Sequence, residues 1–327
     1  MKILLEIQGL HVSFGPVRAV NGVDLTLHEG EFLALVGESG CGKSVSALSV
    51  TRLLPMPPAT IDAGKILFQE SNLLGLSEKE LCNVRGGQIA YIFQEPSTCL
   101  NPVFTIGDQV SENLVLHRHM TRQEAREEAL SLLSRVGIRD PELQLRAYPH
   151  ELSGGMKQRV MIAMAISSRP RLLIADEPTT ALDVTIQDEI LSLLLTLRKE
   201  TGISILFITH DLSLVSQVAD AVAIMYCGKI VERGKTKDVL TAPCHPYTAG
   251  LISCVPKSGF RKQPFPVISG SLPSPTGLPP GCHFHPRCSF KIPRCEEEYP
   301  AVEEKSPGHE VRCFQAEEVV RSFRKDS

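Results

Sequence analysis

The sequence predicts an α/β protein with a largely parallel sheet, an antiparallel β subdomain, a helical subdomain and a small cysteine-bearing C-terminal extension. Two observations predict the parallel sheet. An apolar run over residues 31–36 is typical of a buried strand, and a glycine-rich loop joins it to a helix predicted over residues 43–54. Later in the chain, three apolar strands alternate with helices, which is the order that a parallel sheet requires.

The N-terminal part of the chain is predicted to be rich in β-structure. From Ile3 to Leu35 the apolar stretches are short, and turns are expected at residues 15–16, 21–22 and 29–30. Two further strands are predicted over residues 65–68 and 88–93, with a helical piece over residues 77–84 between them. This part supplies the antiparallel β subdomain of the prediction.

The helical subdomain comes next. Between residues 101 and 168 glycine thins out and apolar residues recur three and four apart, as in residues 125–136. Strands are then predicted over residues 171–176, 204–209 and 221–226, with helices over residues 184–200 and 212–218. Beyond Gly234 the pattern fades, and frequent prolines and glycines over residues 257–280 predict a linker. We therefore expect a main domain over residues 1–241, with its helical subdomain at about 95–168, and an extension over residues 242–327.

The composition is that of an ordinary globular protein. The chain has 327 residues and a formal net charge of −3, so it lacks the basic excess of most nucleic-acid-binding proteins, and we expect no nucleic acid partner. No apolar stretch approaches the ~20 residues that span a bilayer, and the N-terminus lacks a signal-peptide core. We therefore expect a cytosolic protein whose ten cysteines stay reduced.

A phosphate-binding loop is predicted between the first buried strand and its helix. The pattern G-x-x-x-x-G-K-[ST] is matched by Gly37, Glu38, Ser39, Gly40, Cys41, Gly42, Lys43 and Ser44. In such loops the backbone N–H groups cradle phosphates, the lysine reaches the β- and γ-phosphates, and the serine binds Mg²⁺. The alternative is a glycine-rich turn with one solvated lysine, but the flanking strand and helix favour an anion site.

Two carboxylates end the strand predicted over residues 171–176. An acid at the C-terminal edge of a parallel strand faces the crevice where ligands bind, so Asp176 is expected to hold Mg²⁺ directly or through water. Glu177 is then placed to orient or deprotonate the attacking water in phosphoryl transfer. The alternative is a solvated loop acid.

A second glycine motif, Leu152-Ser-Gly-Gly, precedes a helix predicted over residues 156–167. Ser153, Gly154 and Gly155 would present a hydroxyl and bare backbone N–H groups at a positive helix end, which favours a phosphate. The phosphate loop already binds one nucleotide, and the helical subdomain is expected to set the second motif too far away to share it. We therefore infer that this motif serves a nucleotide held by another subunit.

Together these motifs resemble an ATP-binding cassette (ABC) ATPase over roughly residues 4–241. The resemblance implies a phosphate-loop ATPase core that hydrolyses ATP with Mg²⁺. It also assigns roles to further residues: Phe14 stacks on adenine, Gln94 links Mg²⁺ or water to the helical subdomain, residues 181–183 with Asp183 lie at the dimer face, and His210 contacts the γ-phosphate. Gln94 and His210 also follow apolar strands, so each is expected at the same sheet edge as Asp176. For Phe14, the alternative is a core aromatic.

Two short segments resemble a narrower branch of this family. They are Glu-Pro-Ser-Thr-Cys-Leu-Asn-Pro at residues 95–102 and His-Pro-Tyr-Thr-Ala-Gly-Leu at residues 245–251. With the cysteine tail they are similar to the D-type ATPase subunit of dipeptide and oligopeptide importers, a group that also contains nickel importers. The resemblance implies a second, F-type ATPase as a heterodimer partner, two membrane permease subunits, an extracytoplasmic substrate-binding protein and a peripheral position at the cytoplasmic face of the membrane.

Two other classes of protein carry related motifs. A soluble cassette ATPase acting on nucleic acid or ribosomes usually has a coiled coil or two cassettes, and this chain has one phosphate loop and no basic excess. A metal-binding sensor with a degenerate cassette is disfavoured because Glu177 and His210 are intact. The cargo of an importer stays open between dipeptides, oligopeptides and nickel.

Four of the ten cysteines, Cys282, Cys288, Cys295 and Cys313, gather in the tail. Four thiolates suit zinc or an iron–sulfur cluster, and the absence of a C-x2-C pair means that the spacing selects neither. His283 and His285 leave a mixed site open, and unliganded core thiols are the remaining alternative. The resemblance implies a 4Fe-4S cluster, for which we expect a structural role in a tail with little apolar core, with redox sensing as the alternative.

Overall fold

The computed structural model of the protein describes residues 2–180, 182–255 and 267–326. These fall into two compact units. Unit 1 consists of residues 75–208 with two short N-terminal pieces, and unit 2 consists of residues 3–27, 31–74 and the part of the chain from Thr209 onward. Among the described residues, no helix has the length and apolar character needed to cross a bilayer.

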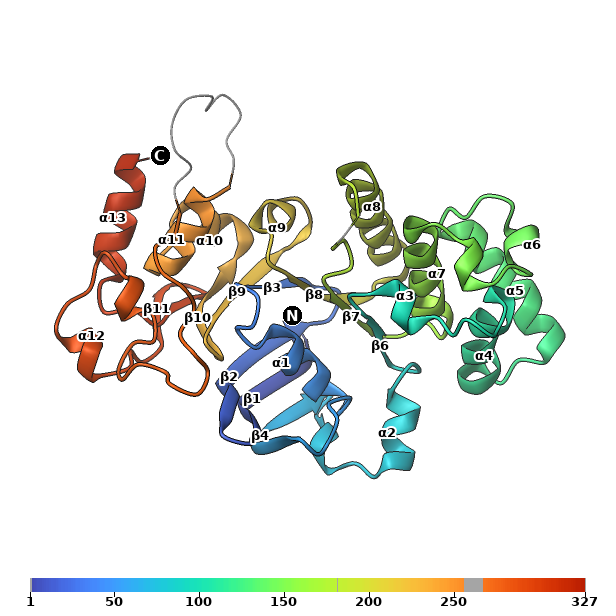
Figure 1. Ribbon diagram of the computed structural model, residues 1–327, viewed down its shortest axis with the longest axis horizontal. Helices are drawn as coiled ribbons and strands as arrows, with labels where there is room; N and C mark the ends of the chain where they lie inside the picture. Colours follow the sequence, from blue (N-terminus) through green and yellow to red (C-terminus); the bar gives the residue numbers. More distant parts are fainter. Residues whose placement is uncertain (1, 181, 256–266, 327) are drawn as a thin grey trace. The chain divides into compact units, whose positions relative to one another are not determined.

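Unit 1 contains three parallel strands that pair side by side. They are β6 (Ile89–Ile92), β7 (Leu172–Asp176) and β8 (Ser204–Thr209), in the order β8-β7-β6 (Figure 1). The register places Ile89 beside Leu172 and Leu172 beside Ser204. Every residue of β7 and β8 is buried, as expected of parallel strands, which have both faces covered.

The rest of unit 1 is mainly helical. Its helices are α2 (Glu78–Val84), α3 (Pro96–Cys99), α4 (Ile106–Arg118), α5 (Arg122–Arg135), α6 (Pro141–Gln144), α7 (Gly154–Ser167) and α8 (Val184–Thr201), with a 3₁₀ turn over Pro149–Glu151. Side-chain caps fix where they begin: Thr105 caps α4, and Thr121 forms a capping box with Glu124 at the start of α5. The contacts among α4, α5 and α7 bury Leu114 and Leu133.

An antiparallel sheet forms the first half of unit 2. Its strands are β1 (Ile3–Phe14), β2 (Val17–His28), β4 (Ala59–Phe68) and β5 (Ser71–Asn72), in the order β2-β1-β4-β5, followed by a 3₁₀ turn over Leu73–Gly75. The turn expected at residues 21–22 is wrong, because β2 continues through it. Gly22 lies within the strand and has a φ of 77°.

A second set of hydrogen-bonded strands in unit 2 has the order β11-β12-β10-β9-β3. Its strands are β3 (Phe32–Val36), β9 (Ala221–Tyr226), β10 (Lys229–Lys235), β11 (Glu303–Ser306) and β12 (His309–Val311). The helices of unit 2 are α1 (Lys43–Val50), α9 (Leu212–Val218), α10 (Thr236–Thr241), α11 (Pro246–Ser253), α12 (Arg294–Glu297) and α13 (Ala316–Asp326), with a 3₁₀ turn over His285–Arg287. β3 and β9 are parallel, and these elements confirm the α/β class.

The C-terminal extension shares this sheet and its core. β12 pairs with β10, so that Val311 lies opposite Glu232. Phe284 of the extension packs edge-on against Tyr226 of β9, with ring centroids 5.2 Å apart, and against Tyr247 of α11. The predicted linker falls partly on residues 257–266, which lie outside the described residues.

Candidate functional site

The loop between β3 and α1 has the local structure of a phosphate site. β3 ends at Val36 and α1 begins at Lys43, so the glycine motif forms the loop and the start of the helix. Glycine is required at two positions. A Cβ on Gly37 would lie 2.3 Å from the carbonyl oxygen of Met225, and one on Gly42, whose φ is 109°, would lie 2.5 Å from that of Ala19.

Lys43 is folded back onto this loop. The residue is 5% exposed, and its Nζ donates hydrogen bonds to the carbonyl oxygens of Gly37 at 2.7 Å and Glu38 at 3.1 Å. The alternative interpretation, a glycine-rich turn with a solvated lysine, is therefore wrong, because Lys43 is buried. The carbonyls keep a buried ammonium group inside the loop, where a phosphate would be its anionic partner.

The two acids at the end of β7 are buried and hydrogen-bonded. Asp176 is 5% exposed and its Oδ2 accepts the phenol of Tyr91 at 2.9 Å. Glu177 is 9% exposed, and its Oε2 accepts Nε2 of Gln94 at 3.1 Å and the hydroxyl of Thr180 at 2.9 Å. The structure thus brings Gln94 and Glu177 together, and neither acid is a solvated loop residue.

Tyr91 and Thr180 were not predicted to belong to the site. Burial, followed by the charge of Asp176, raises the pKa of Tyr91 far above its usual range, so the phenol stays a hydrogen-bond donor. The signal for Tyr91 was its place on β6, which pairs in parallel with β7. A polar residue on that strand, three positions before Gln94, lies one strand away from the acids.

The second glycine motif lies at the beginning of α7. Ser153 is the N-cap, and its Oγ accepts the N–H of Met156 at 3.4 Å. Ser153 and Gly154 are exposed. A Cβ on Gly155 would lie 3.2 Å from Cγ2 of Ile186. The positive end of a 14-residue helix is therefore exposed at the surface of unit 1.

The remaining predicted residues lie at the ends of elements. Phe14 is the half-buried last residue of β1, Asp183 caps α8 by accepting the N–H of Ile186 at 2.9 Å, and His210 is exposed directly after β8. Ala181 of the predicted dimer face lies outside the described residues. Phe14, the phosphate loop and His210 belong to unit 2, whereas Gln94, Ser153, Gly154, Gly155, Asp176, Glu177 and Asp183 belong to unit 1.

The four tail cysteines line one small cavity of unit 2. The pKa of the Cys282 thiol is raised, that of Cys288 to about 11 and that of Cys313 to about 12; burial is the largest cause in each case, and negative charge on neighbouring thiols of the group, including Cys295, acts in the same direction. Four thiolates at this place would repel one another, so the group fits a positively charged metal or cluster.

The two histidines of a mixed site differ in position. His285 lines the cavity of the cysteines, and its Nδ1 lies 3.0 Å from the carbonyl oxygen of Cys282. His283 instead packs edge-on against Tyr299, with centroids 5.0 Å apart. The structure therefore brings the four predicted thiols together with His285.

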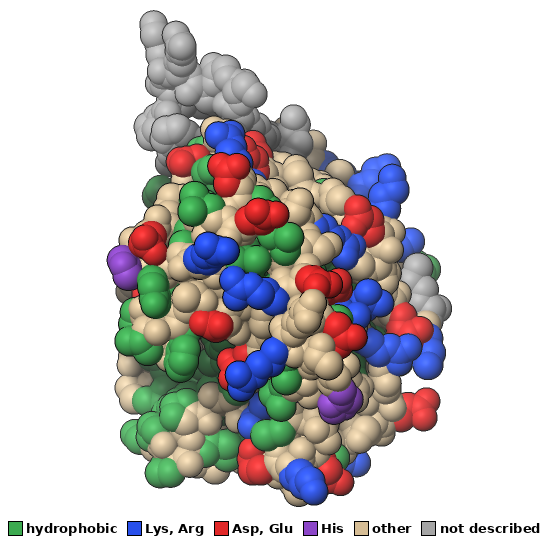
Figure 2. Space-filling view, turned by 90° about the vertical axis from the view of Figure 1, so that its right-hand side faces the viewer, with side chains coloured by type: hydrophobic (Ala, Val, Ile, Leu, Met, Phe, Trp, Pro, Cys, Tyr) green, Lys and Arg blue, Asp and Glu red, His purple; other side chains and the backbone are tan. Residues whose placement is uncertain are grey.

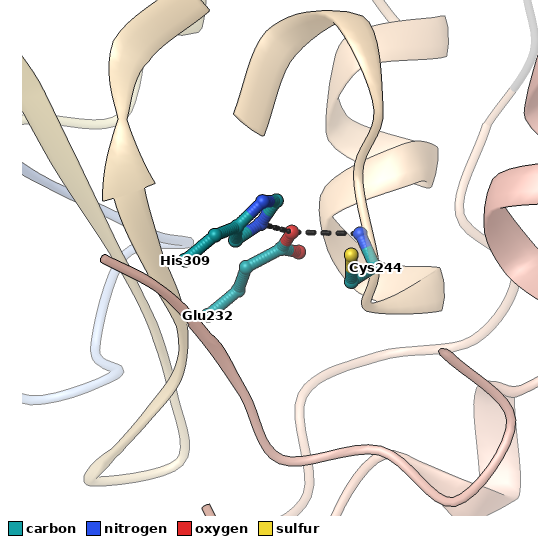
Figure 3. A group of neighbouring side chains, drawn as sticks. All are labelled: Glu232, Cys244 and His309. Carbon is teal, nitrogen blue, oxygen red and sulfur yellow. Dashed lines mark hydrogen bonds and ion pairs between the residues drawn. The ribbon is translucent and has the colours of Figure 1, made fainter. Parts of the chain in front are cut away.

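Glu232, Cys244 and His309 form a second, unpredicted group of potential metal ligands, whose ligand atoms lie within 4.8 Å of one another (Figure 3). The buried carboxylate accepts Nε2 of His309 at 2.7 Å and the backbone N–H groups of Cys244 at 2.7 Å and His245 at 2.9 Å. Contacts with the Cys244 sulfur and with Glu232 raise the pKa of His309 to about 10, against the effect of burial. We interpret this group as an ion pair that joins β10 to β12.

Known families match both parts of the chain. The ABC transporter family matches residues 20–180, and a family described as the C-terminal region of oligopeptide/dipeptide transporters matches residues 231–295. The dipeptide transport ATP-binding protein DppD of Bacillus subtilis is 48% identical over 98% of both chains. The chain belongs to the ATP-binding subunits of the ABC transporter family. This confirms the predicted family and its ABC-type ATP hydrolysis.

Further relatives agree with this membership. The oligopeptide transport ATP-binding protein AppD of Bacillus subtilis is 46% identical, over 97% of this chain and 98% of its own. Among solved structures, the ATP-binding cassette MJ0796, a dimer in a post-hydrolysis state with ADP and phosphate, has a TM-score of 0.64 and 27% identity, covering 71% of this chain and 99% of its own. The solved structure of cbiO1 of Clostridium perfringens has a TM-score of 0.64 and 30% identity, and the match covers 73% of this chain and 91% of cbiO1.

Replacing His309 by leucine is expected to destabilise the protein by about 3–5 kcal/mol, because Glu232 would remain as a buried charge without its cation. The pKa of His309 is raised from 6.5 to about 10, so its contribution is complete below about pH 6.5 and is lost as the pH rises towards 10. Melting temperatures of the wild type and of His309→Leu, measured between about pH 6.5 and 10, check the prediction. The difference should shrink with rising pH, and a constant difference would contradict the ion pair.

Proposed function

We propose that this ABC ATPase energises the import of dipeptides or oligopeptides through a membrane transporter. The observation that carries the ATPase is the buried Lys43 inside a glycine loop at the start of α1. The cargo is supported by the 48% identity to a dipeptide transport ATP-binding protein and by the match of the tail to the oligopeptide/dipeptide family. Basic and acidic side chains are interspersed on the face of the described residues shown in Figure 2, in keeping with a partner other than nucleic acid.

Each part of the nucleotide has a proposed partner. The N–H groups of the phosphate loop and the ammonium of Lys43 bind the phosphates, His210 contacts the γ-phosphate, and Phe14 stacks on adenine. For Mg²⁺ we propose Ser44, Asp176 and Gln94, whose hydroxyl, carboxylate and amide oxygens are the hard donors that this ion prefers. The ion would neutralise phosphate charge.

Glu177 is proposed as the group that orients or deprotonates the attacking water. Its carboxylate is held by Gln94 and Thr180, which fixes the acceptor oxygen while the residue stays 9% exposed. A positioned base of this kind accelerates hydrolysis by taking the proton of water in the transition state.

A second ATPase subunit is proposed as the partner of this chain. Ser153, Gly154 and Gly155 place the exposed end of α7 where a partner's nucleotide could bind, and Asp183 would lie at the dimer face. We further propose an F-type subunit as that partner, two permeases and an external binding protein, with the chain at the cytoplasmic face of the membrane. In this proposal, residues 1–241 are the ATPase domain with a helical subdomain at about 95–168, the part of that subdomain around Gln94 to Asn101 contacts the permease, and residues 242–327 are the importer-type extension.

For the tail cysteines we propose a 4Fe-4S cluster with a structural role. Around one tetrahedral zinc, with Zn–S bonds of ~2.3 Å, the four sulfurs would be only ~3.8 Å apart. Within the described residues, Glu232, Cys244 and His309 have ligand atoms that all lie within 4.8 Å of one another. No three of the tail cysteines, all of which the structure describes, bring their sulfur atoms that close together. The wider spacing of the thiols favours a cluster over a single ion.

Replacing Glu177 by glutamine is expected to leave ATP binding intact and to lower hydrolysis by at least about 100-fold, because the water loses its base. Phosphate release by the assembled transporter measures the rate, and ATP-dependent dimer formation reports the trapped state. Glu200→Gln, at an exposed surface ion pair of the same unit, is the matched control and should turn over normally. Normal turnover by Glu177→Gln would refute the base assignment.

Anaerobically purified protein is expected to be brown and to contain about four iron atoms per chain. Cys295→Ser should lose the iron and the visible absorbance because it removes one ligand, whereas Cys82→Ser, an exposed thiol of unit 1, should keep both. Metal analysis and absorbance spectra check this. Stoichiometric zinc in place of iron would rule out the cluster.

Cells that lack their own peptide importers and express the complete transporter are expected to take up labelled dipeptides or oligopeptides. Lys43→Ala should abolish uptake, because the phosphates lose their cation. Uptake of labelled nickel without peptide uptake would contradict the proposed cargo and leave the ATPase assignment intact.

A further inference from the structure

The C-terminal extension holds a residue of the phosphate loop by its side chain. Glu38 directly follows Gly37, and its Oε2 forms an ion pair with Nη1 of Arg287 at 3.0 Å. The Arg287 side chain is only 6% exposed and that of Glu38 is 29% exposed. A half-buried pair of this kind is screened less by water than a surface pair, so the contact ties loop and tail together.

The guanidinium group of Arg287 is also held by contacts with residues other than Glu38. Its Nε donates to the carbonyl oxygen of Ser269 at 3.0 Å, and Nη1 also lies 3.4 Å from the hydroxyl of Tyr226. The group lies over the rings of Tyr226 and Phe284, with its carbon 5.8 and 5.9 Å from their centroids. Several donors of one planar group are therefore used at once, which only arginine can supply.

The tail side also holds the backbone of Glu38. The N–H of Glu38 donates to the hydroxyl of Tyr247 at 2.9 Å. Tyr247 is fully buried, and its ring lies 4.7 Å from that of Tyr226 and 5.5 Å from that of Phe284. The loop residue next to Gly37 is thus held at its main chain by α11 and at its side chain by Arg287.

We propose that Arg287 is a positioning residue for nucleotide binding, which neutralises Glu38 and anchors the phosphate loop to the C-terminal extension. The proposal rests on the proposed role of residues 37–44 as the phosphate site. Without Arg287, the carboxylate of Glu38 becomes an unpaired negative charge in the loop that receives the phosphates, and it repels them. The extension is therefore part of the ATP-binding machinery.

The test compares Arg287→Ala with Arg294→Ala in the assembled transporter. Arg294 precedes Cys295 as Arg287 precedes Cys288, but it pairs with Glu298 and lies over Phe314. The probe is a fluorescent ATP analogue titrated into each protein to obtain Kd. Arg287→Ala is expected to weaken binding about five- to tenfold, and Arg294→Ala to stay within about twofold of the wild type.

Rescue separates charge neutralisation from a general role in folding. Adding Glu38→Gln to Arg287→Ala removes the unpaired charge and is expected to return Kd to within about twofold of the wild type. If Arg287→Ala does not assemble, Arg287→Gln, which lacks the charge but keeps amide donors, is measured in its place with the same expected weakening and rescue.

Wild-type affinity in the Arg287 variants, or a weakened affinity that Glu38→Gln does not restore, would overturn the proposal. Lys43→Ala in the same titration tests the phosphate site separately from the role of Arg287. Undiminished binding by Lys43→Ala would refute the phosphate site itself. Lost binding by Lys43→Ala together with wild-type affinity of Arg287→Ala would refute only the role of Arg287.

Discussion

Close approach of backbone to backbone at the phosphate loop is the constraint on which much of unit 2 depends. Gly37 lies against the carbonyl of Met225 on β9, and Gly42 lies against that of Ala19 on β2. Because any side chain at these positions would collide with main chain, β9 and β2 fix the loop from two sides. The parallel pairing of β3 with β9, which sets Leu33 beside Ala221, brings β9 to the loop.

Buried carboxylates in both units accept hydrogen bonds from nearby donor groups. Asp176 accepts the phenol of Tyr91, and Glu232 accepts an imidazole and two backbone N–H groups. An unpaired charge at either place would cost several kcal/mol, so these partners are requirements of the fold and not additions to it. At Glu232 these donors come from His309 on β12 and from the backbone of Cys244 and His245, so the carboxylate links β10 to two other segments of unit 2.

The sequence predicted elements with uniform apolar runs most accurately. Ser204–Thr209 and Ala221–Tyr226 have the predicted bounds, and nearly every residue of these two strands is buried. Leu212–Val218 also has the predicted bounds, with its apolar side chains buried. β10 was missed because it carries charged residues, and its buried Glu232 is paired with a histidine 77 residues further along the chain. The motifs predicted the neighbourhood of Gln94 and Glu177. Tyr91 and Tyr247 lie in segments that the sequence analysis had noted, but the partners of Tyr91, Tyr247 and Arg287 lie far away along the chain, and only the tertiary structure shows these contacts.

The contact between Arg287 and Glu38 spans 249 positions of the chain. On a ribosome, β3, the glycine loop and α1 emerge long before the arginine that pairs with Glu38. Contacts of such long separation close late, because ordering the intervening chain must come first. The side chain of Glu38 can therefore reach the pairing seen in the structure only after the segment around Arg287 has been synthesised and has folded against the loop.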